Sequence, residues 1–159
     1  MAEKSFTHLN DQGDAKVVDV SAKEVTVRSA TARGQVSISA EVVSMLRGAG
    51  VPKGDALAVA RIAGIQGAKR TSDLIPLCHP IAIHAVEVEL VVVDAGVEIT
   101  VTVRTADRTG VEMEALTGVS VAALALIDMV KGVDRMASIA GVELVEKQGG
   151  RSGHWVRGQ

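Results

Sequence analysis

The sequence predicts an α+β fold, in which helices cover one face of a single antiparallel sheet in the order β-α-β-β-α-β. Alternating apolar and polar residues mark a hairpin over residues 86–103. Helical stretches precede this hairpin, and a long apolar helix with a final strand follows it. This order of elements is the ferredoxin-like plan.

The first strand is predicted over residues 25–38, where valine and isoleucine alternate with polar side chains. Gly34 predicts a bulge or bend within it. Ser39 is placed to cap a short helix that Gly48 and Gly50 bring to an end.

A second helix is predicted over residues 55–71, with Gly64 and Gly67 inside it. These glycines weaken the helix but permit close packing. Residues 72–80 contain two prolines and predict a rigid loop. The turn Asp94-Ala95-Gly96 then joins the two strands of the hairpin.

The long helix begins after Thr109-Gly110, which supply a turn and a candidate N-cap. Residues 116–127 carry no charge, so we expect this helix to be buried against more than one neighbour. Its end carries Asp128 and Lys131 on one face. A buried pair of charges is costly, which indicates a functional use, but an ordinary intrahelical ion pair remains an alternative.

A last strand is predicted over residues 142–147, followed by a glycine-rich tail. Residues 1–16 are polar and predict a flexible leader, so residues 17–159 form the single domain. The long helix has more apolar surface than one sheet face can hide, which predicts an oligomer.

Composition excludes several classes of protein. A net charge of −2 and an aromatic content of 1% argue against a nucleic-acid partner. The single cysteine, Cys78, fits a reducing compartment. We see no signal peptide, and the longest uncharged run is too short to span a bilayer, so we expect a soluble cytoplasmic protein without a membrane partner.

Four features are candidates for chemistry. Cys78 and His79 lie side by side in the proline-braced loop, a poor spacing for a metal or a Cys nucleophile, so a buried thiol and a structural histidine remain an alternative. Lys53 at a helix start, and Lys147 and Arg151 around glycines, can bind phosphate or be solvated turns. The fourth feature is the Asp–Lys pair.

Residues alone leave open an enzyme, a ligand-binding module that senses a phosphorylated small molecule, and an interaction scaffold. Longer motifs resemble one family: KGD at 53–55, ARIAGIQGAKR at 60–70, DLIPLCHP at 73–80 and TGVEMEALT at 109–117. The family is cyclic pyranopterin monophosphate synthase, the C-type protein (MoaC) of molybdenum cofactor biosynthesis. The resemblance covers almost the whole chain after the leader.

The resemblance implies a ferredoxin-like lyase, a homohexamer built as a trimer of dimers with its site at a subunit boundary. Its substrate is 3′,8-cyclo-7,8-dihydroguanosine 5′-triphosphate from an upstream radical enzyme, with which transient contact is expected. The products are cyclic pyranopterin monophosphate and diphosphate, and neither a metal nor another cofactor is implied.

The resemblance also implies site residues. The catalytic residues are Lys53, His79, Asp128 and Lys131. The substrate-binding residues are Leu77, Cys78, His79, Glu112, Met113, Glu114, Lys147 and Arg151. Two positions depart from the family pattern: Ser72 replaces a common Trp, and Arg151 replaces a frequent Lys, which keeps the charge but binds phosphate as a fork.

Overall fold

The computed structural model describes residues 8–48, 51, 55–151 and 153–159. Its elements, in chain order, are β1 (Thr26–Ser37), α1 (Ala40–Arg47), α2 (Ala56–Lys69), α3 (Thr71–Leu74), β2 (Ile83–Val93), β3 (Gly96–Asp107), α4 (Glu112–Val130), β4 (Ser138–Gln148) and β5 (Trp155–Val156). Predicted features at Gly50 and Lys53 lie outside the described residues.

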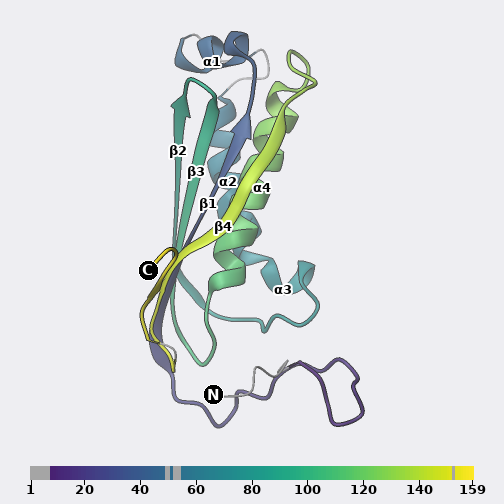
Figure 1. The fold of residues 1–159 in the computed structure, drawn as a ribbon, viewed down its shortest axis with the longest axis vertical. Helices are drawn as coiled ribbons and strands as arrows, with labels where there is room; N and C mark the ends of the chain where they lie inside the picture. The colour runs from purple at the N-terminus through teal and green to yellow at the C-terminus, as the bar shows by residue number, and fades with distance from the viewer. Residues whose placement is uncertain (1–7, 49–50, 52–54, 152) are drawn as a thin grey trace.

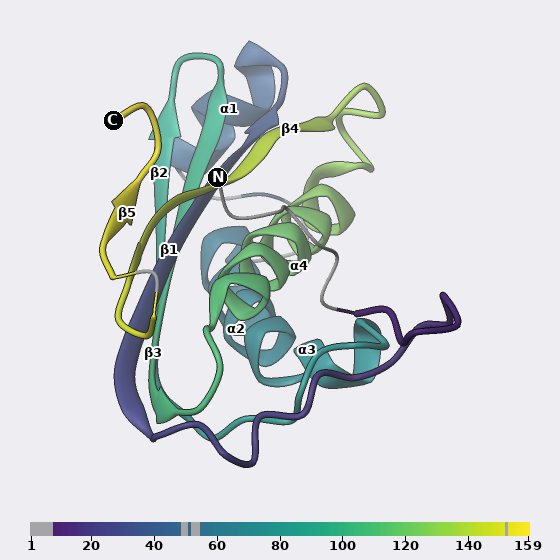
Figure 2. The same ribbon diagram turned by 60° about the horizontal axis from the view of Figure 1, so that its bottom comes forward.

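The strands form one antiparallel sheet in the order β2-β3-β1-β4-β5. Helices α2 and α4 run side by side over one face of this sheet (Figures 1 and 2). The first four strands in this order reproduce the ferredoxin-like arrangement, so the predicted fold class is confirmed. The glycine-rich tail adds a short fifth strand, β5, beside β4.

Strand β1 is the central strand of the sheet, and its small apolar residues face the helices. Ala30, Ala32 and Val36 are fully or almost fully buried. The pairing of β1 with β4 shifts in register between Arg33 and Gln35, across Gly34, where the sequence predicts a bulge or bend, and also between Thr31 and Ala32. A Cβ at Gly34 would come within 2.7 Å of Val119 on α4, so this glycine lets the central helix approach the sheet.

The hairpin of β2 and β3 turns through two residues, Asp94 and Ala95, and Val93 pairs with Gly96. Gly96 has a φ of +148°, and a Cβ there would overlap the carbonyl oxygen of Val36 on β1. Both constraints require glycine at this position. The predicted hairpin is confirmed.

The cap predicted at Ser39 is confirmed, and Asp55, for which no cap was predicted from the sequence, caps α2 in the same way. The side chain of Ser39 accepts from the Val42 amide, and that of Asp55 accepts from the Ala58 amide. At α4 the prediction is wrong: the N-cap is Val111, which makes no side-chain hydrogen bond, rather than Thr109-Gly110. The loop predicted over 72–80 also differs, because its first residues belong to the short helix α3.

Helix α4 is the core of the domain, and its faces contact α2, β1, β3 and β4. By length and composition alone, Glu112–Val130 is also apolar enough to cross a membrane, but half of it is buried inside the fold. Val119, Ala122 and Leu126 are completely buried, as expected for a helix surrounded by neighbours.

Helices α2 and α4 approach closely at the predicted glycines. A Cβ on Gly64 would lie 3.1 Å from the Cβ of Ala122 and from the Gly118 carbonyl oxygen. A Cβ on Gly67 would lie 2.7 Å from both Cβ and Cγ2 of Val121. Valine is stiff about χ1, and its Cβ moves only with the helix backbone. The close approach of α2 to α4 therefore requires glycine at these two positions.

We expect Gly67→Ala to destabilise the protein. Alanine raises helix propensity by about 1 kcal/mol, but overpacking at a rigid contact costs about 1–3 kcal/mol, and here the steric cost is the larger. Gly132→Ala is the matched control, because no atom lies within 4 Å of its added Cβ. Denaturant unfolding followed by circular dichroism measures both, and equal midpoints would contradict the packing role.

Residues 8–16 contain a local turn. The side-chain oxygen of Asn10 accepts from the amides of Gln12 and Asp14, and Leu9 bridges to Ala15. From this turn the chain runs past α3 and below the end of the sheet before it enters β1 (Figures 1 and 2). Its path lies beside the loop that carries His79.

Candidate functional site

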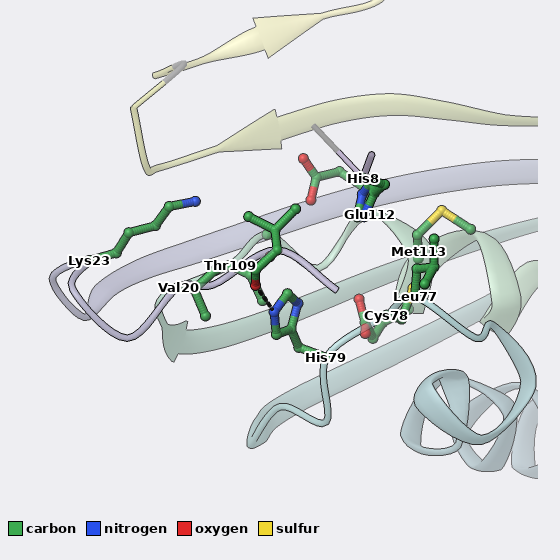
Figure 3. A pocket seen from close by; sticks show the side chains of 12 residues that line it. His8, Val20, Lys23, Leu77, Cys78, His79, Thr109, Glu112 and Met113 are labelled. Atoms are coloured by element: carbon green, nitrogen blue, oxygen red, sulfur yellow. Dashed lines mark hydrogen bonds between the residues drawn. The ribbon is translucent and has the colours of Figure 1, made fainter. Parts of the chain in front are cut away.

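A cavity of about 320 Å³ lies where three segments meet: the N-terminal segment, the loop after α3 and the first turn of α4. Figure 3 shows its side chains, with Lys23 at the opposite end from Met113. Its lining residues are His8, Val18, Val20, Lys23, Leu77, Cys78, His79, Thr109, Gly110, Glu112, Met113 and Glu114. The structure thus brings together six of the predicted site residues.

The first turn of α4 contributes two carboxylates in different environments. Glu114 points inward and is 4% exposed, whereas Glu112 lies two residues earlier and is half-buried. The pKa of Glu114 is raised from 4.5 to about 7, mainly by burial; the nearby charge of Glu112 adds to the rise, and a backbone hydrogen bond opposes it. Glu114 therefore exchanges a proton near neutral pH, as a general acid or base must.

His79 is held by the proline-braced loop and by the N-terminal segment. The Cys78 amide donates to the Ile75 carbonyl, which turns the chain just before the histidine. The Nε2 atom of His79 lies 2.6 Å from the carbonyl oxygen of Val18 (Figure 3). The ring is therefore fixed at the cavity wall on one side, as a proton-transfer group requires.

Cys78 lines the same cavity, but its thiol is poorly suited to nucleophilic attack. Burial raises its pKa, and the negative charge of Glu114 raises it further. Because the thiolate is the reactive form, these surroundings keep Cys78 protonated and unreactive. The structure agrees with the low weight that the sequence gives to a Cys nucleophile.

Lys147 lies beside the cavity rather than in its wall. Its Nζ pairs with Oε1 of Glu112 at 2.9 Å, and this contact joins β4 to the start of α4. Arg151 is exposed on the turn after β4. An anion in the cavity would therefore compete with Glu112 for the Lys147 charge.

The structure places the predicted pair at the other end of α4. Lys131 Nζ lies 2.6 Å from Asp128 Oδ1, and their side chains are 58% and 57% exposed. The expectation of a pair kept in an apolar interior is wrong for a single chain. Asp128 lies fourteen residues beyond Glu114, about 21 Å along the helix axis, so the pair does not reach the cavity of its own chain.

Sequence reasoning missed the N-terminal wall of the cavity. His8 falls in the predicted leader, and Val18, Val20 and Lys23 were not assigned to the site. The alternation of Val18 and Val20 around Asp19 was the available signal, because it places both valines on one side of the chain. In the described part of the chain, no group of three or more His, Cys, Asp or Glu side chains is arranged to hold a metal.

Comparisons with known proteins find relatives that match almost the whole chain. The family model described as MoaC family matches residues 17–150. A cyclic pyranopterin monophosphate synthase of Streptomyces avermitilis is 62% identical over 156 residues, which cover 98% of this chain and 92% of the relative. That of Streptomyces griseus is 63% identical over 98% of this chain and 88% of the relative. Cyclic pyranopterin monophosphate synthase 2 of Mycobacterium tuberculosis is 54% identical over 96% of this chain and 91% of the relative.

Proposed function

This chain belongs to the MoaC family, and we propose that it is a cyclic pyranopterin monophosphate synthase of molybdenum cofactor biosynthesis. The reaction converts 3′,8-cyclo-7,8-dihydroguanosine 5′-triphosphate to cyclic pyranopterin monophosphate and diphosphate. The observation that carries the proposal is the cavity, which gathers His79 and two unlike carboxylates, Glu112 and Glu114, within the matched region. The named relatives favour an enzyme over a sensor or a scaffold.

The chemistry needs acids and bases more than a redox group. Opening and reclosing a purine ring moves protons on and off nitrogen and carbon, which requires positioned acids and bases. Closing the cyclic phosphate requires a hydroxyl of the substrate to lose its proton and attack the α-phosphorus while diphosphate leaves. His79 and Glu114 are placed to move protons, and Glu114 does so near neutral pH.

Cations around the cavity stabilise the triphosphate and the leaving diphosphate in this proposal. Lys23 lines the cavity, and Lys147 reaches its edge through Glu112. Arg151 follows on the turn after β4, and Lys53, outside the described residues, is assigned to the same role from its sequence. Leu77 and Met113 supply apolar contacts for the ring system.

A second subunit completes the site in this proposal. The Asp128–Lys131 pair lies too far along α4 to serve its own cavity, so it serves the cavity of a neighbour. Exposed apolar residues on the outer faces of α2 and α4, Ile62 (61% exposed) and Leu124 (59%), support association. We propose the homohexamer, a trimer of dimers, as the assembly.

Localisation and supply of the substrate are further proposals. The burial of half of α4 inside the fold supports a soluble enzyme over a membrane-spanning one, and the single cysteine supports a reducing, cytoplasmic location. The substrate is expected from an upstream radical enzyme, with which a transient contact is proposed.

The direct test is chemical conversion. Purified protein with the isolated cyclised nucleotide should release one diphosphate for each cyclic pyranopterin formed, measured by mass spectrometry and a diphosphate assay. Binding of the nucleotide without conversion would favour the sensor alternative and contradict the proposed synthase.

We expect Lys147→Gln to raise KM for the nucleotide by about 10–100-fold, because one charged hydrogen bond to phosphate is lost. Arg33→Gln is the control: Arg33 also loses a carboxylate partner, Glu143 at 2.6 Å, but lies on the sheet face away from the helices. Steady-state kinetics of both variants measure the effect. An unchanged KM in Lys147→Gln would remove Lys147 from the substrate site.

A further inference from the structure

We propose that the main-chain carbonyl of Val18 holds His79 in the tautomer protonated on Nε2, so that Nδ1 is the nitrogen that exchanges protons with the substrate. The role of Nδ1 in proton exchange rests on the proposed function, but the tautomer of His79 does not. Val18 acts here as a positioning residue, and the N-terminal segment becomes part of the site.

The hydrogen bond fixes where the ring proton lies. His79 Nε2 and the Val18 carbonyl oxygen are 2.6 Å apart, although 61 residues separate them in the sequence. A carbonyl oxygen has no proton to donate, so Nε2 must donate. A neutral imidazole carries one ring proton, and its other nitrogen then presents a lone pair.

The second nitrogen is available to a ligand. In the described part of the chain, Nδ1 of His79 has no hydrogen-bond partner. Figure 3 shows one ring nitrogen directed to the N-terminal segment and the other to the side where Leu77 and Cys78 lie. Glu114 lines the same cavity. Nδ1 is therefore the acceptor that faces the reacting ligand.

The N-terminal segment is built to present the Val18 carbonyl. Val18 and Val20 are both partly buried and both line the cavity, whereas Asp19 between them is exposed. The Asp19 side chain accepts from the Ser21 amide at 2.8 Å, a local turn that fixes the backbone. The carbonyl thus meets His79 from a segment whose backbone is fixed by a turn directly after Val18.

Nitrogen-15 NMR of ring-labelled, full-length protein tests the tautomer directly. The His79 signals are assigned by their loss in His79→Gln and are recorded at a pH where the ring is neutral. We expect a protonated Nε2 and an unprotonated Nδ1. The opposite tautomer, an even mixture of the two, or a ring that stays doubly protonated wherever the protein is folded would each overturn the proposal.

Two variants separate the two nitrogens. The amide of Gln lies near the Nε2 position and can still donate to Val18, whereas the amide of Asn lies near Nδ1 and cannot reach it. We expect trypsin to cleave the N-terminal segment at Lys16 and Lys23 about tenfold faster in His79→Asn than in His79→Gln, the change expected when one hydrogen bond is lost.

His84→Gln is the control for cleavage, because His84 is exposed and accepts from the Ala106 amide on β3. Its cleavage rate should match that of the unmodified protein. Equal cleavage rates in His79→Asn and His79→Gln would overturn the role of Val18. The NMR signals and the cleavage rates do not depend on turnover. A failure of this proposal can therefore be told apart from a failure of the proposed synthase activity.

Discussion

Lys131→Ala and Asp128→Ala should each lower turnover by about 10²–10⁴-fold, the contribution of one positioned acid or base, while the protein stays folded. The two side chains pair with each other at 2.6 Å, but both are more than half exposed. An exposed ion pair contributes at most about 1 kcal/mol to stability, so its loss does not unfold the protein. A large kinetic effect with a small effect on stability identifies a catalytic pair.

Arg47→Ala is the matched control, because Arg47 forms a similarly exposed ion pair with Asp94 at 2.8 Å, away from the cavity. Single-turnover rates and thermal unfolding are measured for all three variants. Near-normal rates in Lys131→Ala and Asp128→Ala would contradict a catalytic role. The pair would then be an ordinary intrahelical ion pair, the alternative that the sequence left open.

A mixing experiment tests whether neighbouring subunits share the site. Lys131→Ala chains keep a normal cavity, and His79→Ala chains keep a normal Asp–Lys pair. In oligomers reassembled from equal amounts of both, about one quarter of the sites combine an intact cavity with an intact pair from the neighbour. Recovery of about one quarter of wild-type activity is expected, and no recovery would contradict the shared site.

The fold was predictable because each local pattern agrees with the final structure. Alternation located β2 and β3, and Gly34 marked the place where the pairing of β1 with β4 slips. The start of α4 was not predictable, because Val111 makes no side-chain cap and tertiary packing holds the helix end instead.

The site was predictable in part, for a geometric reason. Helical periodicity places Glu114 and Asp128 on one stripe of α4, but residues on one stripe can lie many turns apart. The pair is thus about 21 Å from the cavity along the helix. The hydrogen bond from His79 to Val18 involves a main-chain carbonyl. Every residue has such a carbonyl, so the sequence gives no sign of this contact.

Glu114→Gln should make the protein more stable at neutral pH and much less active. Glu114 is 4% exposed, and its burial raises the pKa from 4.5 to about 7. Below pH 4.5 the carboxyl is protonated in both the folded and the unfolded chain. As pH rises from 4.5 to about 7, the unfolded chain releases this proton first, so the free energy of unfolding falls.

Above about pH 7 the folded protein carries the full cost of a buried carboxylate. A difference of about 2.5 between the two pKa values corresponds to about 3 kcal/mol. Gln has the same shape and does not ionise. The free energy of unfolding of Glu114→Gln should therefore exceed that of wild type by up to about 3 kcal/mol at high pH and match it at low pH.

Denaturant unfolding across this pH range measures the difference, and turnover of the same protein should fall by about 10²–10⁴-fold because Gln transfers no proton. Glu87→Gln is the control: Glu87 is an exposed carboxylate paired with Arg104 at 3.0 Å, so its replacement removes no buried charge and should not reproduce the gain. If the advantage of Glu114→Gln did not change with pH, Glu114 would not be a desolvated carboxyl. Its proposed part in proton transfer would then lose its physical basis.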